Sequence, residues 1–212
     1  MRKEIIGDCE LYLGSCLDII ESISPIDSIV TDPPFGMGYQ SGWRKEQHEK
    51  IQNDESDELL RFSCALNVQY SKYIFCRWDN LFNLPNKPSS LITWVKNNHT
   101  SGDLEHQHAR QTENILFYPG PYHTFPKKRP ADVIYCPKVS SNSHPTEKPE
   151  QLMRVLCDWT TGTVVDPFMG SGTTGVSCAK LKRKFIGVEL EQKYFDIACK
   201  RIENAYKELS LF

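Results

Sequence analysis

Short apolar runs alternate with amphipathic stretches along the whole chain, and this alternation limits the fold more than any other feature. An apolar run of about four to eight residues suits a buried strand, whereas apolar residues at every third or fourth position indicate a helix. Strands that alternate with helices are typical of an α/β layer fold. The predicted strands are residues 28–31, 73–76, 90–95, 114–118, 163–165 and 185–188. The predicted helices are residues 15–23, 57–70, 149–160, 173–182 and 191–208.

Chain length and charge limit the class of protein. The 212 residues are enough for one compact domain over residues 1–212. Because 25 Lys and Arg face 27 Asp and Glu, the net charge is -2, which excludes binding of nucleic acid through overall positive charge but permits a local basic cleft. The sequence shows neither an apolar stretch of membrane-spanning length nor a secretion signal, so a cytoplasmic location is expected.

Metal binding is not expected from the cysteine and histidine pattern. The eight cysteines form no Cys-x-x-Cys pair and several lie in apolar segments, which favours buried thiols in a reducing compartment. A local group of four histidines offers a metal site as the alternative to exposed or substrate-contacting residues, but it has no ligand partners at metal-site spacing. These histidines are His99, His106, His108 and His123.

Two polar stretches are predicted to be functional loops. Residues 36–56 contain three glycines and a highly polar tail, so we expect a loop that is mobile without a ligand. Residues 97–143 are polar and dotted with prolines, and their second half carries a positive bias. The alternative for these charges is an ordinary solvated surface.

A glycine turn at residues 165–175, between a predicted strand and a predicted helix, is the sharpest local signal. Gly170 and Gly172 let the backbone turn tightly and let a ligand approach, while the following helix presents free N–H groups to an anion. A phosphate-binding P-loop would place a lysine before the Ser/Thr, where this chain has Gly172, and the spacing of a nucleophile elbow is absent. The turn is therefore predicted to hold a nucleotide or a cofactor.

Two acidic residues narrow the choice of cofactor. Glu189 closes the next predicted strand, where dinucleotide folds place an acid that binds the ribose hydroxyls. Asp166 would repel a pyrophosphate, so an adenosine ligand that carries a cation fits better than a dinucleotide. S-adenosylmethionine has the ribose, an ammonium group for Asp166 and a carboxylate for the helix N-terminus or a lysine. We predict S-adenosylmethionine as the cofactor.

A proline-rich segment, Asp32-Pro33-Pro34-Phe35, follows the predicted strand at residues 28–31. The two prolines restrict the backbone and remove two N–H donors, so the segment offers carbonyl acceptors, a carboxylate and an aromatic face as one rigid unit. The exocyclic amine of a nucleobase needs these acceptors and a flat partner for its ring. Taken alone, the segment is also compatible with a plain proline turn capped by an aspartate.

Three motifs together carry a family resemblance. Asp32-Pro33-Pro34-Phe35 resembles the catalytic (Asp/Asn)-Pro-Pro-(Tyr/Phe) tetrad of amino-methylating DNA methyltransferases, and residues 166–174 resemble their cofactor motif. His144-Pro145-Thr146-Glu147-Lys148-Pro149 is similar to an element of the permuted β-type N6-adenine/N4-cytosine group, which shares this motif order. Tyr194, Ala198 and Arg201-Ile202 extend the resemblance. It implies a Rossmann-like fold with a mostly parallel seven-stranded sheet that contains one antiparallel strand.

The resemblance implies methyl transfer from S-adenosylmethionine to the N6 amino group of adenine in duplex DNA, by base flipping and direct in-line attack. Aspartate at position 32 matches adenine-N6 members, whereas cytosine-N4 members usually have Ser-Pro-Pro; the cytosine alternative stays open. RNA or protein amide methylation and a catalytically silent DNA-binding subunit are further alternatives. Carbon-5 cytosine chemistry needs a Pro-Cys nucleophile, and Cys136-Pro137 has the reverse order.

The biological role of this expected bacterial or phage-encoded, nucleoid-associated protein stays open among restriction-modification, phage counter-defence and epigenetic marking. The recognition sequence and the oligomeric state are not determined by the sequence. Because residues 97–143 leave little recognition surface, a homodimer that covers duplex DNA is one alternative.

Motif matches assign the candidate residues. The catalytic residues are Asp32, Pro33, Pro34 and Phe35. The cofactor-binding residues are Asp32, His144, Thr146, Lys148, Asp166, Phe168, Gly170, Ser171, Gly172, Thr173 and Glu189. Candidates for DNA phosphate contacts are Arg44, Lys45, Lys127, Lys128 and Arg129.

Overall fold

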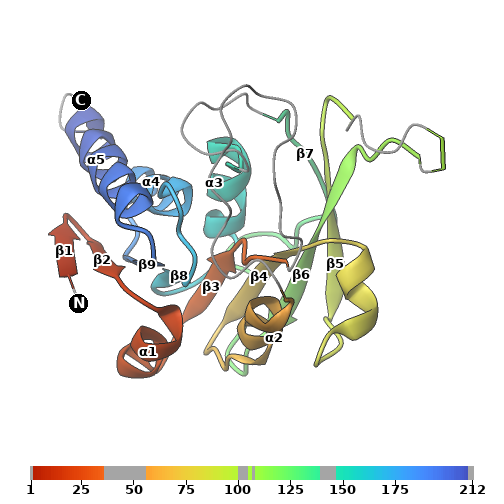
Figure 1. The fold of residues 1–212 in the computed structure, drawn as a ribbon, viewed down its shortest axis with the longest axis horizontal. Helices are drawn as coiled ribbons and strands as arrows, with labels where there is room; N and C mark the ends of the chain where they lie inside the picture. Colours follow the sequence, from red (N-terminus) through yellow and green to blue (C-terminus); the bar gives the residue numbers. More distant parts are fainter. Residues whose placement is uncertain (1, 36–55, 100–104, 107, 139–146, 210–212) are drawn as a thin grey trace.

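The computed structural model describes residues 2–35, 56–99, 105–106, 108–138 and 147–209. These residues build an open twisted sheet with helices on both faces, which confirms the predicted α/β class (Figure 1). The strands are β1 (Arg2–Ile6), β2 (Cys9–Leu13), β3 (Ser28–Thr31), β4 (Ser71–Cys76), β5 (Ser90–Val95), β6 (Thr112–Pro119), β7 (Val133–Tyr135), β8 (Val164–Asp166) and β9 (Phe185–Glu189). The α-helices are α1 (Cys16–Ile20), α2 (Glu58–Ala65), α3 (Glu150–Asp158), α4 (Thr173–Lys180) and α5 (Gln192–Leu209), with 3₁₀ turns at Glu21–Ile23 and Asp79–Asn83.

The sheet has nine strands in the described part of the chain, in the order β1-β2-β9-β8-β3-β4-β6-β5-β7, which corrects the expected seven. The inner seven run from β2 to β5, and β6 is the strand among them that pairs antiparallel on both sides. The two additional strands, β1 and β7, lie at the edges. β1 is a charged strand in an antiparallel hairpin with β2, and β7 is only three residues long, so neither carries a clear apolar pattern.

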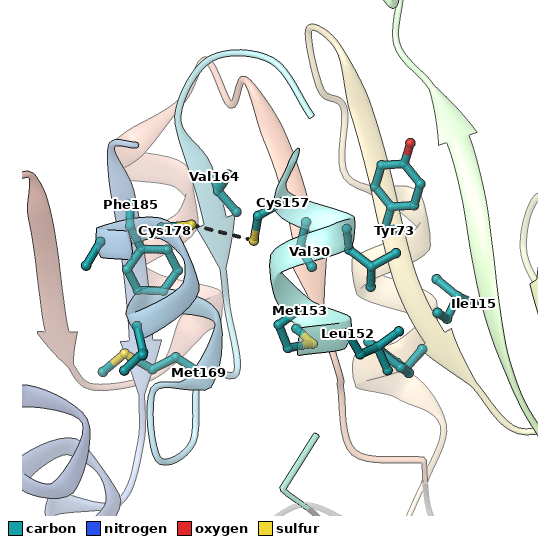
Figure 2. Close-up of a cluster of buried hydrophobic side chains, with 14 of the residues drawn as sticks. Val30, Tyr73, Ile115, Leu152, Met153, Cys157, Val164, Met169, Cys178 and Phe185 are labelled. Atoms are coloured by element: carbon teal, nitrogen blue, oxygen red, sulfur yellow. Dashed lines mark hydrogen bonds between the residues drawn. The ribbon is translucent and has the colours of Figure 1, made fainter. Parts of the chain in front are cut away.

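Helices cover the sheet in two groups. α3, α4 and α5 pack on one face, and α1 and α2 pack on the other (Figure 1). Strand β3 shows the division, because Val30 joins the cluster beneath α3, α4 and α5, whereas Ile29 joins the cluster beneath α1. Figure 2 shows the first cluster, with Leu152 and Met153 of α3 packed beside β3 and β4. Burial of both faces explains why the central strands are nearly continuous apolar runs.

Helix α2 ends at Ala65, five residues before the predicted end at residue 70. The ammonium group of Lys72 donates hydrogen bonds to the carbonyls of Cys64 (2.5 Å) and Leu66 (2.6 Å). This lysine, buried on β4, satisfies carbonyls that the helix leaves open at its C-terminus. The early end of α2 is therefore a tertiary effect that the local pattern of residues 57–70 does not contain.

The two predicted loops differ in how far the structure describes them. Residues 36–55 lie outside the described residues, so the expected mobility of residues 36–56 stays a prediction. Residues 97–143 do not form one loop, which corrects the expectation: they contribute β6 and β7 to the sheet, and β6 pairs with both β4 and β5. Within the described ranges, no helix is long and apolar enough to cross a membrane. All eight cysteines are free thiols.

Candidate active site

The site lies where two parallel strands end next to each other. β3 and β8 are hydrogen-bonded neighbours, with Ser28 opposite Val164 and Ile29 opposite Val165. This register brings Thr31, at the end of β3, to the same edge as Asp166, at the end of β8. The chain continues from β3 to β4 on one side, while β8 and β9 lie on the other. Such a switch point at the carboxyl ends of strands is where open α/β sheets bind ligands.

Asp166 links the two strands through its carboxylate. Oδ1 accepts hydrogen bonds from Thr31 Oγ1 (2.6 Å) and the Phe168 backbone N–H (3.1 Å), and Oδ2 accepts one from Thr174 Oγ1 (2.6 Å). Burial and, to a smaller extent, the charge of Asp32 raise the pKa of Asp166 to about 6, against the effect of these hydrogen bonds. A carboxylate offers about four acceptor positions, so three are used and one on Oδ2 is left for a cation.

Gly170 and Gly172 both have positive φ angles, but the space around them differs. At Gly172 (φ +83°) a Cβ atom would lie 2.8 Å from Cβ of Ala198, so this glycine lets α4 approach α5. At Gly170 (φ +52°) a Cβ atom would meet nothing within 4 Å. The backbone at Gly170 thus borders open space at the carboxyl end of β8, as a cofactor cradle requires.

Glu189 supports this turn from the end of β9. Its Oε2 accepts a hydrogen bond from the Gly170 N–H (3.0 Å), and its Oε1 accepts one from the Glu191 N–H (2.7 Å). Burial raises the pKa of Glu189 to about 7. Each oxygen keeps capacity for one more donor, so the carboxylate can bind a pair of hydroxyl groups beside the turn.

Arg201 of α5 joins the glycine turn to the segment before α3. Its Nη1 donates to the Ser171 carbonyl (2.9 Å) and Oγ (2.8 Å), and its Nη2 donates to Glu147 Oε1 (2.5 Å). Glu147 Oε1 also accepts from Thr173 Oγ1 (3.2 Å). The sequence motifs contained Glu147 and Arg201 but assigned them no role, because their contact joins residues 54 positions apart.

Lys148 joins this segment to the proline motif. Its ammonium group lies 2.9 Å from Asp32 Oδ2 and 3.0 Å from Glu113 Oε2. Glu113, on β6, also forms an ion pair with Lys96, at 3.1 Å from its Oε1. Sequence reasoning missed Glu113 and Lys96; the available signal was a lone carboxylate just before the apolar run of β6. The predicted contact of Lys148 with a cofactor carboxylate stays a prediction.

The proline motif continues from β3 into a partly buried aromatic residue. Pro33 is buried, whereas Asp32, Pro34 and Phe35 are partly exposed. Phe35 packs at the edge of two core clusters, and its carbonyl accepts a hydrogen bond from the Asn80 side chain (3.5 Å). A carboxylate and an aromatic ring are thus held by the same rigid turn at the switch point.

The structure separates Lys127 from this site. Its ammonium group lies 2.6 Å from Asp158, the last residue of α3. Figure 2 shows neighbouring Cys157 at the end of the cluster where Val164 begins β8, while Met169, beyond β8, lies at the opposite end. Lys128 and Arg129 follow Lys127 and are exposed. The structure therefore does not bring this basic run to the edge that carries Asp32.

Four predicted residues lie outside the described part of the chain: Arg44, Lys45, His144 and Thr146. Among the residues that the structure describes, no group of three His, Cys, Asp or Glu side chains is arranged to hold a metal ion.

The residues at the switch point fit S-adenosylmethionine. The open space at Gly170 accommodates a ligand against the backbone, and Glu189 can take two ribose hydroxyls. Asp166 has one acceptor position for an ammonium group. The site thus combines groups for an adenosyl sulfonium with a carboxylate, Asp32, on the neighbouring strand.

Comparison with known proteins gives independent information on family. Residues 26–200 match the family model of DNA methylases. Type II methyltransferase M.HinfI from Haemophilus influenzae is 46% identical over an alignment of 255 positions, which covers 95% of this chain and 71% of that protein.

Solved structures show the same fold. The crystal structure of the M1.HpyAVI-SAM complex superimposes with a TM-score of 0.68 at 27% identity, covering 91% of this chain and 99% of that one. PvuII DNA methyltransferase, described as cytosine-N4-specific, superimposes with a TM-score of 0.69 at 16% identity, covering 96% of this chain and 93% of that one. At that identity, the second likeness is one of fold alone.

Proposed function

The chain belongs to the N6/N4 DNA methylase family and uses S-adenosylmethionine, and from this premise we propose that it methylates the N6 amino group of adenine in duplex DNA. The observation that carries the proposal is the placement of Asp32 beside the cofactor strand, through the 2.6 Å hydrogen bond between Thr31 and Asp166. This bond ties the residue before the catalytic motif directly to the cofactor motif.

Cofactor binding is assigned to the switch point. Glu189 binds the ribose hydroxyls, Asp166 binds the methionine ammonium group, and the backbone from Phe168 to Thr173 borders the methionine end. Bound S-adenosylmethionine supplies an electrophilic methyl group on a positively charged sulfur. The glycine turn orients that methyl group, and positioning of this kind provides a large part of the rate in a direct transfer.

Asp32, Pro33 and Phe35 are proposed to hold the target adenine after it leaves the duplex, which costs a few kcal/mol. The ring stacks on Phe35, while the N6 hydrogens are accepted by the Asp32 carboxylate and the Pro33 carbonyl. These two bonds draw the N6 lone pair out of conjugation with the ring, so it can attack the methyl carbon. The new N–C bond forms as the C–S bond breaks with its electron pair on sulfur, and N6 then loses a proton to solvent.

We propose adenine as the target base, and not cytosine, because position 32 is an aspartate. Fold cannot separate the two bases, since the cytosine-N4-specific PvuII enzyme has the same architecture. Incubation of the full chain with unmethylated genomic DNA and S-adenosylmethionine, followed by mass spectrometry of the nucleosides, tests the choice directly. We expect N6-methyladenine. N4-methylcytosine alone would refute the base assignment, and methyl groups found only on transfer RNA or protein would refute DNA as the substrate.

DNA phosphate contacts are proposed away from the target base. Lys127, Lys128 and Arg129 remain candidates for phosphate binding, although Lys127 is paired with Asp158 at the other end of β8. Phosphate contacts would make DNA binding strongly dependent on salt. If Lys128 and Arg129 contact phosphates, replacing both with uncharged residues should make the DNA-binding constant less dependent on salt concentration. An unchanged salt dependence would show that they do not contact the DNA.

A further inference from the structure

Four charged side chains form an alternating row that ends at the proposed catalytic carboxylate. Lys96 Nζ lies 3.1 Å from Glu113 Oε1, and Glu113 Oε2 lies 3.0 Å from Lys148 Nζ. Lys148 Nζ in turn lies 2.9 Å from Asp32 Oδ2. Each oxygen of Glu113 therefore binds one ammonium group, and Lys148 is shared by two carboxylates.

Aromatic rings of the core support both lysines. Lys148 Nζ lies 4.8 Å from the centre of the Phe75 ring, and Lys96 Nζ lies 5.6 Å from the centre of the Trp94 ring. The two rings contact each other edge to face at 6.4 Å and are fully buried. The lysine side chains are only 11% and 5% exposed, whereas those of Asp32 and Glu113 are 22% and 32% exposed, so the row consists of buried ammonium groups with partly exposed carboxylates.

In Glu113 and Lys148, the attraction of the neighbouring charges outweighs the cost of burying the charged form. Although burial opposes ionisation of Glu113, the ammonium groups of Lys148 and Lys96 lower its pKa to about 2. Burial likewise opposes the charge on Lys148, but Asp32 and Glu113 raise the pKa of Lys148. Glu113 and Lys148 thus stay charged across the neutral range, and each depends on the opposite charges beside it for stability.

We propose that Glu113 is a positioning residue for the methyl transfer: with Lys96 behind it, it holds the Lys148 ammonium group against Oδ2 of Asp32 and thereby orients that carboxylate toward the base. The inference rests on the proposed function. Glu113 touches neither base nor cofactor in this scheme and acts through Lys148 alone.

The sharing of Lys148 between two carboxylates affects how well Asp32 can accept hydrogen bonds. An ammonium group paired with Asp32 alone would bind its carboxylate more strongly and would weaken Asp32 as an acceptor for the N6 hydrogens. With Glu113 on its other side, Lys148 balances the charge of Asp32 and leaves acceptor capacity for the amino group. It also counteracts the repulsion between Asp32 and buried Asp166, which share the same edge of the sheet.

A double-mutant cycle with Glu113→Gln and Lys148→Met tests the inference in the full chain. Initial rates of tritium transfer from labelled S-adenosylmethionine to unmethylated genomic DNA give kcat, and calorimetry gives the cofactor Kd. We expect Glu113→Gln to lower kcat by about tenfold or more and Lys148→Met by about 100-fold, since small misplacements have effects of this size. Cofactor Kd should change by less than about threefold in Glu113→Gln, because Glu189, Asp166 and the glycine turn, to which cofactor binding is assigned above, are unchanged in this variant.

The decisive result is the behaviour of Glu113→Gln in the Lys148→Met background. If Glu113 acts through Lys148, the second substitution lowers kcat by less than about twofold, because the interaction is already lost. Full additivity of the two effects, or wild-type kcat in Glu113→Gln, would overturn the proposal. Lys148→Arg should recover part of the activity that Lys148→Met loses, because it restores the positive charge.

Control variants distinguish an effect on kcat from a folding defect, and failure of this inference from failure of the proposed function. Lys180→Met breaks a comparable pair, Lys180–Glu150 at 3.0 Å, away from the site, and should leave kcat unchanged. If Glu113→Gln does not fold, Glu113→Asp retains the charge one methylene further back and should show the same kcat effect in weaker form, and an unchanged kcat there would overturn the proposal. Wild-type protein that methylates no DNA refutes the proposed function, whereas active wild type with unaffected Glu113 variants refutes only this inference.

Discussion

Thr31 donates a 2.6 Å hydrogen bond to Asp166, and both residues are the last of their strands. The bond joins β3, which leads into the proline motif, to β8, which leads into the glycine turn. Because both partners are buried, their geometry is protected from water. The proline motif and the glycine turn, although the two bonded residues are 135 positions apart, therefore share one fixed point.

Thr31→Val should lower the free energy of unfolding by about 2 kcal/mol, because it removes a buried hydrogen bond to a charged acceptor. Urea denaturation measures the change. Thr160→Val is the matched control, since buried Thr160 donates to a neutral acceptor, the Cys157 carbonyl, away from the site. The control should cost about 1 kcal/mol and leave kcat unchanged. Equal losses of stability and activity in the two variants would contradict the role of the Thr31–Asp166 bond.

Asp32→Ala should abolish methyl transfer, with a kcat loss of at least about 100-fold, because the N6 hydrogens lose their charged acceptor. Affinity for S-adenosylmethionine should stay within about tenfold of wild type, since Glu189 and the glycine turn are unchanged. Lys148 keeps Glu113 as its partner in this variant, so the fold should survive. Rapid-quench methylation assays and calorimetry check the two quantities, and wild-type turnover would reject the catalytic role.

Cofactor affinity should rise with pH around the pKa of Glu189, which burial raises from 4.5 to about 7. The native state holds the proton on the Glu189 carboxyl more tightly than the unfolded chain does. The contribution of this protonated carboxyl to stability is therefore lost as pH rises from 4.5 through about 7. Binding of ribose hydroxyls favours the ionised carboxylate, so Kd should decrease between about pH 6.5 and about pH 8. Calorimetry on wild type and Glu189→Gln tests this; the same pH dependence in both would rule out the ribose role.

Alanine at Gly170 and at Gly172 should have different consequences, although both positions have positive φ. Each substitution costs about 1 to 2 kcal/mol for the left-handed backbone. Gly172→Ala adds a contact at 2.8 Å with Ala198 and should lose clearly more stability. Gly170→Ala projects its methyl group into the proposed cofactor space, so its main effect should be weaker cofactor binding. Thermal unfolding and calorimetry distinguish them, and matching profiles would argue against a ligand at Gly170.

Local pattern was sufficient for most of the fold. The strands that carry Thr31 and Asp166 are short apolar runs buried on both faces, and their length and composition identify them without tertiary information. The glycine turn likewise follows from residue type, because Gly172 must adopt a positive φ just before α4. Three strands, β1, β2 and β7, were not among those predicted. The charged β1 and the three-residue β7 depend on pairing with β2 and β5, and β2 is held between β1 and β9.

The candidate site residues likewise divide into those that local sequence indicates and those that only tertiary contacts bring together. Asp32 and Gly170 could be predicted as candidate site residues because each belongs to a compact motif, and Glu189 could be predicted because it ends the strand that follows the glycine turn; their roles stay proposals. Glu113 and Lys96 belong to no motif, and only the antiparallel pairing of β5 with β6 brings them together.

The amino-acid sequence by itself determined which short segments bear the chemistry and in what order, since these depend on the conformational limits of proline and glycine within a few residues. Tertiary structure alone decided which charges meet, placing Lys148 between Asp32 and Glu113 and drawing Lys127 to the far end of α3. The physical reason is range: backbone preference acts between neighbours in the chain, whereas an ion pair forms wherever packing of the sheet and helices leaves two side chains within about 3 Å.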